Sequence, residues 1–442
     1  MFTKKDLHKL IIPLIIEQFL AVSVGMADTI MITCRGEEAV SGISIVDSIS
    51  ILLIGLFSAL ATGGAVVTAQ YLGHKEKENA KTASNQLVLS IGVVSLIIMM
   101  VTLIGNHAIL RLIYGKVDPL IMKNARIYFY LSSLSYPFIA LYNAGAALFR
   151  AMGNSKVSMR VSFYMNCINV VGNALLIYVF KMGVEGAGIS TLCSRMIAAV
   201  IVIGMLMQKK YEVGIDPHLR LGYQPKMIKR ILSIGIPNGL ENSMFQFGKI
   251  LVSGLVASFG TISITANAVG NSVASFNCIP GNAIGLAMIT VVGQCVGAGE
   301  LGQAKKYTKK LLLMAYASMT VLNLGMLLLM PDIVSMFNLQ AATQALATKL
   351  LIYHCICSIL IWPLSFTLPN ALRAANDVKF TMLTSVISMW VCRVILSFVL
   401  AKTFKMGVFG VWVAMTIDWV FRSLFFVIRL KTDGWRKHAL IS

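Results

Sequence analysis

Residues 70–81 read QYLGHKEKENAK, and residues 294–305 read QCVGAGELGQAK. The two stretches share Gln, Gly, Glu and Ala-Lys at positions that differ by 224 in every case. The same offset relates two further motifs, each present twice: Pro-x-x-x-Glu at 13–17 and 237–241, and Phe-Lys-Met-Gly-Val-x-Gly at 180–186 and 404–410. Two copies of one structural unit therefore make up the chain.

The composition predicts that the chain lies in a lipid bilayer. Of its 442 residues 57% are hydrophobic and only 13% are charged, and the mean hydropathy is +0.78, more apolar material than a soluble core of this length can bury. Because lipid offers no hydrogen-bond partner to the backbone, and the apolar runs are too long for barrel strands, we expect helices. Twelve spans are predicted to begin near residues 10, 45, 87, 125, 158, 187, 228, 266, 311, 346, 381 and 408.

The net charge of +20 is distributed unevenly along the chain. With the N-terminus inside, about 25 Lys and Arg fall on the inner side and about 9 on the outer side, as the positive-inside rule predicts. We therefore expect a multi-pass protein of the cell (cytoplasmic) membrane with both termini in the cytoplasm and no nucleic-acid partner. One loop departs from this pattern, since Arg111, Lys116, Lys123 and Arg126 are basic on the predicted outer side.

The predicted domain organisation follows from the even number of spans in each copy. Six spans return the chain to the same side, so the second copy enters the membrane in the same orientation as the first. We expect an N-lobe at 1–207, a cytoplasmic linker at 208–226 rich in Gly and Pro, and a C-lobe at 227–442. Two six-helix bundles would then be related by a pseudo-two-fold axis along the membrane normal, with a substrate cleft between them.

Motifs for nucleotide use and for enzymatic chemistry are missing from the sequence. It contains no G-x-x-x-x-G-K-[ST] and no H-E-x-x-H, and the G-x-G-x-x-G match at 297–302 follows a predicted span instead of a strand. The eight cysteines lie in or beside apolar spans, where packing is the expected role. We expect no enzyme activity and no cofactor.

Ionisable residues inside the predicted spans are the strongest indication of function, since each costs about 2.5–3.5 kcal/mol at the bilayer centre. They are Glu17, Asp28, Glu241 and Asp418, with Arg195, Lys249, Arg393 and Arg422. Glu17 and Asp28 are separated by eleven residues, which places them about 20° apart around one helix, so both can face one aqueous cleft. Asn169 and Asn173 likewise share a helix face, and Thr191 of the next span can add a hydroxyl.

These motifs together resemble the multidrug and toxic compound extrusion (MATE) family, bacterial type. The resemblance rests on the paired Pro-x-x-x-Glu motifs, Ala27-Asp28-Thr29, Gln70-x-x-Gly73, Asn169-x-x-x-Asn173 and the Gly-x-Gly-x-Ser-Thr run at 186–191, and it covers nearly the whole chain. It implies an antiporter that exports organic, often cationic, compounds as H⁺ or Na⁺ enters. It also implies that Asp28, Asn169, Asn173 and Thr191 form the cation site of the N-lobe, where Na⁺ is a possible ligand.

The chain departs from the family pattern at two places. Many relatives carry Asp where this chain has Asn173, so Asp28 alone supplies a formal charge to the implied site, which weakens the case for tight metal binding and favours coupling to H⁺. Some relatives place an acid two turns after the proline of span seven, where this chain has Phe245 and Gln246. Glu241 is then the expected acid of the C-lobe, in a cleft that Lys249, Arg393, His354 and Gln246 can also face.

Several of these residues have a structural alternative. Glu17 and Glu241 either carry a cation or satisfy backbone groups freed by the prolines one turn earlier, and Asp418 with Arg422 fits a structural ion pair. Arg393 occupies the repeat position of Asn169, so the two lobes differ, and it can hold a carboxylate in place. Lys249 fits either a tethered cation or a snorkelling lysine, and His354 fits packing or a proton relay. Candidates for stacking on an aromatic cation are Tyr136, Tyr142, Phe163, Phe276 and Trp362.

The expected mechanism is a rocking of the two lobes around the cleft. A carboxylate in a partly dry cleft can hold a proton or Na⁺ taken up from outside and exchange it for a cationic drug from inside, so the two ligands compete for one negative field. We expect a monomer that contacts a small organic substrate and membrane lipids. The alternative is a flippase for lipid-linked oligosaccharides or another amphiphile, which calls for a cavity rich in Arg and Lys.

Overall fold

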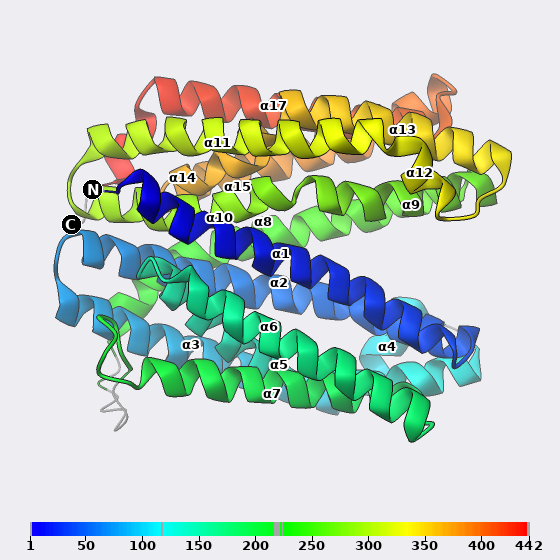
Figure 1. The fold of residues 1–442 in the computed structure, drawn as a ribbon, viewed down its shortest axis with the longest axis horizontal. Helices are drawn as coiled ribbons and strands as arrows, with labels where there is room; N and C mark the ends of the chain where they lie inside the picture. Colours follow the sequence, from blue (N-terminus) through cyan, green and yellow to red (C-terminus); the bar gives the residue numbers. More distant parts are fainter. Residues whose placement is uncertain (1, 116–117, 216–221, 223, 440–442) are drawn as a thin grey trace. The chain divides into compact units, whose positions relative to one another are not determined.

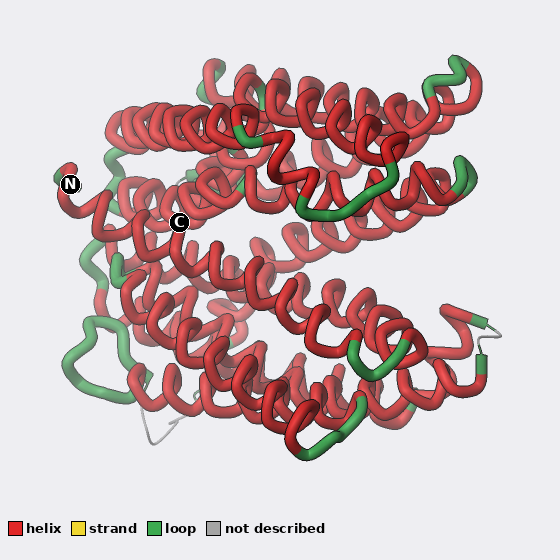
Figure 2. The backbone as a smooth tube through the Cα atoms, turned by 45° about the vertical axis from the view of Figure 1, so that its right-hand side comes forward, coloured by secondary structure: helices red, strands yellow, loops and turns green. Residues whose placement is uncertain are grey.

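Apart from short loops, the protein is entirely helical within the residues that the structure describes. The structure is a computed structural model that describes residues 2–115, 118–215, 222 and 224–439. Figure 2 shows the described chain as successive helices joined by short connections, without a strand. Ten of these helices are long and apolar enough to cross a membrane. This confirms the predicted all-helical membrane fold.

The chain divides into two compact units. The first unit is Lys4–Gly239, and the second is Leu240–Ser442 together with residues 1–3. The boundary falls inside helix α8 (Pro225–Ala257). Part of the expected linker, residues 216–221 and 223, lies outside the described residues.

Helices of the first unit run side by side along the horizontal direction of Figure 1, in blue to green. They are α1 (Lys4–Thr33), α2 (Glu37–Gly73), α3 (Lys77–Ile104), α4 (Asn106–Tyr114), α5 (Pro119–Ala151), α6 (Ser155–Asn173), η1 (Ala174–Val179) and α7 (Val184–Leu206), followed by the first half of α8. α4 is a short helix that separates α3 from α5. At its start α5 is capped, because Asp118 Oδ1 accepts a hydrogen bond of 2.8 Å from the Leu120 backbone and Pro119 occupies the first turn.

The second unit repeats this order with more interruptions. After α8 it contains α9 (Thr261–Asn277), α10 (Ile279–Gly297), α11 (Leu301–Leu328), α12 (Met330–Ser335), α13 (Ala341–Leu360), η2 (Pro363–Thr367), α14 (Pro369–Ala374), α15 (Val378–Ser388), η3 (Met389–Ile395), α16 (Leu396–Phe398), η4 (Val399–Thr403), α17 (Gly407–Lys431) and η5 (Gly434–His438). α5 and α8, at 33 residues each, complete the twelve expected spans beside the ten apolar helices.

Backbone conformation confirms the internal repeat independently of side-chain identity. Residues with positive φ, a conformation that side chains with a Cβ seldom adopt, occur in pairs about 224 positions apart. The pairs are Gly36 (98°) with Gly260 (87°), Lys75 (63°) with Gly299 (74°), Gly153 (76°) with Asn376 (65°), and Lys181 (55°) with Lys405 (55°). The same turns therefore lie between equivalent helices in both units, even where one or both copies lack glycine at the turn.

Four π-helical segments interrupt otherwise regular helices: η1, η2, η3 and η4. Such segments are rare and are found most often beside functional residues. η1 begins directly after Asn173, and η3 contains Arg393. The fifth span of each copy therefore departs from regular α-helical hydrogen bonding beside a polar residue singled out from the sequence, Asn173 in the first copy and Arg393 in the second.

Candidate functional site

A polar cavity of about 300 Å³ lies inside the first unit. Helices α1, α2, α5, α6 and α7 all contribute to its wall. Its polar lining includes Asp28, Asp47, Tyr128, Asn169, Asn173, Thr191 and Arg195. The four residues implied by resemblance as the N-lobe cation site are therefore gathered around one cavity by three helices, α1, α6 and α7.

Asp28 is held by two amide side chains. Asn173 donates a hydrogen bond of 2.8 Å from Nδ2 to Asp28 Oδ1. With its amide nitrogen turned toward the carboxylate, Asn169 donates to Asp28 Oδ1 at 2.9 Å and to Oδ2 at 3.0 Å. The other end of the Asn169 amide lies 3.3 Å from the Thr191 hydroxyl. Donation from both amides matches a carboxylate that carries its negative charge.

Local packing fixes the two asparagines. They are four residues apart on α6, so both point to the same side of the helix. α6 lies close against α7, because Ser190 Oγ donates a hydrogen bond of 2.7 Å to the Asn169 backbone oxygen. Gly172 allows this approach, since a Cβ there would lie 2.5 Å from Ser190 Oγ. The glycine therefore allows the close approach of α6 and α7, the two helices that carry Asn169, Asn173 and Thr191.

One amide oxygen in the cavity is left without a partner. Asn173 Oδ1 is buried and has no hydrogen-bond partner among the residues that the structure describes. A buried acceptor without a donor is costly, so such an atom marks a place where a ligand can be bound. Together with Asp28, it supplies two of the oxygen ligands that Na⁺ would need.

Asp47, Tyr128 and Arg195 extend the site beyond the predicted residues. Asp47 of α2 and Tyr128 of α5 line the same cavity as Thr191. Arg195 donates a hydrogen bond of 2.7 Å from Nη1 to Ser135 Oγ. The cavity therefore holds two carboxylates and one guanidinium, a net negative charge.

Asp47 and Tyr128 were not predicted as members of the site. The apolar pattern of the second span does not show which way the helix is rotated, so it could not place Asp47 beside Asp28. For Tyr128, nothing in the sequence distinguished it from the other aromatic residues.

Glu17 and Glu241 occupy equivalent positions in the two units and form equivalent ion pairs. Glu17 Oε1 lies 3.2 Å from Arg150 Nη1, and Glu241 Oε1 lies 2.7 Å from Arg373 Nη2. Ser158 donates a further hydrogen bond of 2.7 Å to Glu17 Oε2. Both acids are buried. Each acid is thus paired with an arginine, and Glu17 is not among the described residues that line the Asp28 cavity. The two alternatives for these acids, a cation carrier or a partner for backbone groups freed by proline, stay open.

Asp418 of α17 is a fully buried acid of the second unit. Arg422 Nε lies 2.9 Å from Asp418 Oδ1, which confirms the predicted ion pair, and Arg393 Nη1 lies 4.0 Å from Oδ2. The Ser388 hydroxyl also donates to Asp418. Phe245 lies beside both guanidinium groups, with its ring centre 5.3 Å from Arg393 and 5.2 Å from Arg422. With two guanidiniums and one carboxylate, this cluster is net positive, opposite in sign to the cavity of the first unit.

The other residues expected to face a C-lobe cleft lie in different settings. His354 is buried between the indole rings of Trp412 and Trp419, with ring centres 5.6 Å and 5.4 Å away, which matches the packing alternative. Lys249 is exposed, and Gln246 is partly buried on the same helix. Their roles stay predictions.

The structure buries three of the five aromatic residues predicted to stack on a substrate. Tyr136 is fully buried and lies 3.1 Å from the Ser50 hydroxyl, and Tyr142 is buried as well. Trp362 is buried and stacks on Phe366, with ring centres 5.0 Å apart. Of the five, Phe163 is exposed and Phe276 is half-buried.

Comparison with known families gives one match that spans most of the chain. The MatE family model matches residues 13–175 and 237–399, one segment in each copy of the repeat. Among curated proteins, the chain is 25% identical to "Uncharacterized transporter YisQ" of Bacillus subtilis, covering 97% of this chain and 94% of the relative. It is 23% identical to "Probable multidrug resistance protein NorM" of Thermotoga maritima, covering 99% and 94%.

Solved structures agree with the fold. The chain is similar to "Outward-facing conformation of a multidrug resistance MATE family transporter of the MOP superfamily", with a TM-score of 0.90, 18% identity and coverage of 98% of this chain and 97% of the other. It is also similar to "Crystal structure of MATE in the bent conformation", with a TM-score of 0.89, 17% identity and coverage of 99% and 97%. At these identities the likeness concerns the fold.

Proposed function

The chain is a multi-pass membrane transporter of the MatE family, and we propose that it exports organic, often cationic, compounds in exchange for a monovalent cation, H⁺ or Na⁺. The observation that carries the proposal is the net negative cavity of the first unit. There Asp28 is ringed by the amides of Asn169 and Asn173 and lies near the Thr191 hydroxyl.

Drug export is supported by the relatives. Two of them are called multidrug resistance protein or multidrug transporter by name, and they align along nearly the full length of this chain. The expected rocking of two lobes and the cytoplasmic position of both termini stay predictions.

Asp28 is the proposed carrier of the coupling cation. In the geometry described, both amides donate to it, which is the arrangement that a charged carboxylate requires before it accepts a cation. Binding of H⁺ or Na⁺ would require the amides to turn, because a protonated oxygen needs an acceptor and a metal ion needs carbonyl oxygens. Asn173 Oδ1, buried and without a described partner, is placed to serve in either case.

The charge of the cavity also bears on the substrate. Two carboxylates against one guanidinium favour a cationic compound over an anionic one. A flippase for pyrophosphate-linked lipids calls for the opposite balance, and Arg195 is the one guanidinium among the residues that line this cavity within the described part of the chain.

Replacement of one carboxylate tests the proposal in cells. Asp28→Asn keeps the size of the side chain and removes its charge, so we expect cells that express it to lose efflux of a fluorescent organic cation at unchanged protein level in the membrane. Glu37→Gln, an exposed residue at the start of α2, is the matched control and should behave as the wild type. Full efflux by Asp28→Asn would reject Asp28 as the coupling residue.

A further inference from the structure

A second and larger hollow, of about 1080 Å³, lies at the end of the first unit where α3, α4, α5 and α7 meet. It is formed by other residues than the Asp28 cavity, and the transport mechanism makes no use of it. Along the chain it lies at the end of the helices opposite Lys4, the end that the charge distribution predicts to face outside. This is also the region where the sequence breaks the positive-inside pattern.

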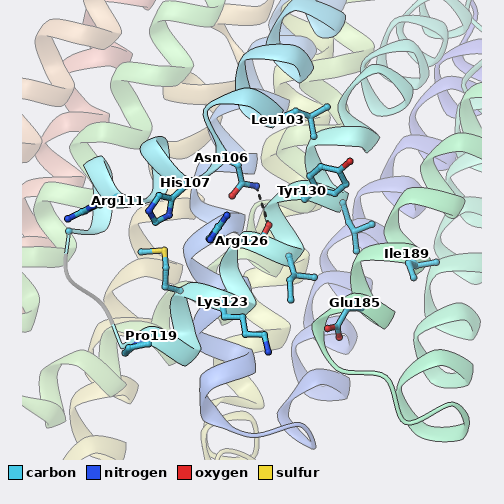
Figure 3. A pocket seen from close by; sticks show the side chains of 14 residues that line it. Leu103, Asn106, His107, Arg111, Pro119, Lys123, Arg126, Tyr130, Glu185 and Ile189 are labelled. Atoms are coloured by element: carbon cyan, nitrogen blue, oxygen red, sulfur yellow. Dashed lines mark hydrogen bonds between the residues drawn. The ribbon is translucent and has the colours of Figure 1, made fainter.

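The rim of the hollow is basic. Arg111 of α4 and Lys123 and Arg126 of α5 line it, and all three side chains are exposed. Within the described residues, none of these three cations has a carboxylate within 4.0 Å, although Glu185 lies on the same wall. In Figure 3 Arg111 and Arg126 lie on either side of His107, and Lys123 lies apart from them on the same rim. A hydrogen bond of 3.1 Å from Asn106 Nδ2 to the Arg126 backbone oxygen joins α4 to α5.

The deeper wall of the hollow is apolar. Tyr130 and Leu131 lie one to two turns beyond Arg126 and Lys123 on α5, which corresponds to about 6–12 Å along the helix, and Ile189 faces the hollow from α7. Figure 3 shows Tyr130 and Ile189 on this wall. The hollow therefore has positively charged side chains near the ends of the helices and apolar side chains toward their middle.

An apolar groove on α3 ends at Gly105, which is next in the chain to Asn106 of the hollow. It has a volume of about 510 Å³, and its lining residues are Leu96, Ile97, Met100, Val101, Ile104 and Gly105. The five side chains with hydrocarbon are exposed in the structure, as is Leu112 of α4. In a membrane protein such surface lies against acyl chains, and α4, at nine residues, is too short to span the bilayer.

We propose that this hollow binds one anionic phospholipid, with its phosphate held by Arg111, Lys123 and Arg126 and its acyl chains along the α5–α7 wall and the α3 groove. Unpaired guanidiniums and an ammonium match a phosphate headgroup in charge and in hydrogen-bond donors. Basic pockets between spanning helices are a recurrent means of binding such lipids. The apolar groove favours a lipid over a soluble phosphate, because only a lipid has acyl chains that can cover its apolar side chains.

Native mass spectrometry of the purified full-length protein tests the proposal. The wild type is titrated with phosphatidylglycerol, with phosphatidylcholine of the same acyl chains, and with inorganic phosphate as competitor. We expect one phosphatidylglycerol to be retained under conditions that remove phosphatidylcholine, and millimolar phosphate to leave it in place. Equal retention of both lipids, or displacement by phosphate, would overturn the proposal.

Variants locate the site. Each cation removed should weaken binding about fivefold, so the triple change Arg111→Gln, Lys123→Gln and Arg126→Gln should weaken it on the order of 100-fold. The control removes three exposed lysines elsewhere (Lys226→Gln, Lys229→Gln and Lys309→Gln) and should retain the lipid. An equal loss in the control would point to general charge attraction and reject the site.

Further variants cover the case in which the triple variant does not fold, and separate lipid binding from export. If the triple variant does not fold, Arg111→Gln and Arg126→Gln are measured singly, and an unchanged affinity in both would contradict the proposal. Asp28→Asn should keep the full preference for phosphatidylglycerol, so failure of the lipid site and failure of the proposed export are distinguishable.

Discussion

Asn173 donates a hydrogen bond of 2.8 Å from Nδ2 to Asp28 Oδ1, while its own Oδ1 is buried with no hydrogen-bond partner among the described residues. One amide thus both stabilises the charged carboxylate and holds an unused acceptor beside it. In the proposed cation site, the amide would need only to turn to present its oxygen to a cation beside Asp28.

Asn173→Asp is expected to raise the affinity of the protein for Na⁺. The change adds a second negative oxygen ligand within 2.8 Å of Asp28, and cation affinity rises with ligand charge. We expect thermal stabilisation by Na⁺ to appear at concentrations at least about tenfold lower than in the wild type. Asn271→Asp, the same change on exposed α9 at the repeat position of Asp47, should leave the Na⁺ dependence as it was. No shift with Asn173→Asp would argue against cation binding at this amide.

The internal repeat, and the equivalent turns between helices that it produces, could be predicted from the sequence. Helix-terminating turns follow from local chemistry, which is why Lys181 and Lys405 share a φ of 55° in two copies of one motif. Ion pairs and other contacts between helices far apart in the sequence could not be predicted. Arg150 lies 133 residues from Glu17 in the sequence, and the apolar pattern of α1 or α5 does not show which face of one helix contacts the other. The same holds for Asp47 and Tyr128, which join the Asp28 cavity through the rotation of α2 and α5.

Asp418→Asn should destabilise the second unit strongly. The variant leaves the buried Arg422 without its partner at 2.9 Å and removes the charge opposite Arg393, and breaking one side of a buried ion pair costs about 3–5 kcal/mol. The free energy of unfolding in mixed detergent micelles measures this loss. Asp332→Asn, at an exposed position on α12, is the control and should change it by less than about 0.5 kcal/mol. A variant as stable as the wild type would mean that the cluster does not stabilise the fold.

Gly63→Ala and Gly204→Ala should have opposite effects on stability. A Cβ at Gly63 would lie 2.6 Å from the Ile231 backbone oxygen and 2.9 Å from the Gly235 backbone nitrogen, so α2 and α8 must separate, at a cost of about 1–3 kcal/mol. Gly204 of α7 has no heavy atom within 4 Å of an added Cβ, so alanine there should stabilise the helix by about 0.5–1 kcal/mol. Unfolding measurements on both variants check the contrast. Equal tolerance at the two positions would refute the close α2–α8 packing.

Cation coupling through Asp28 is tested most directly by flux in proteoliposomes. The purified protein is reconstituted, a pH gradient or a Na⁺ gradient is imposed separately, and movement of a fluorescent organic cation is followed. We predict that one of the two gradients drives movement against the concentration of the organic cation in the wild type, and that the same gradient drives none in Asp28→Asn. Gradient-driven movement that persists in Asp28→Asn, or wild-type movement that responds to neither gradient, would contradict the proposed exchange.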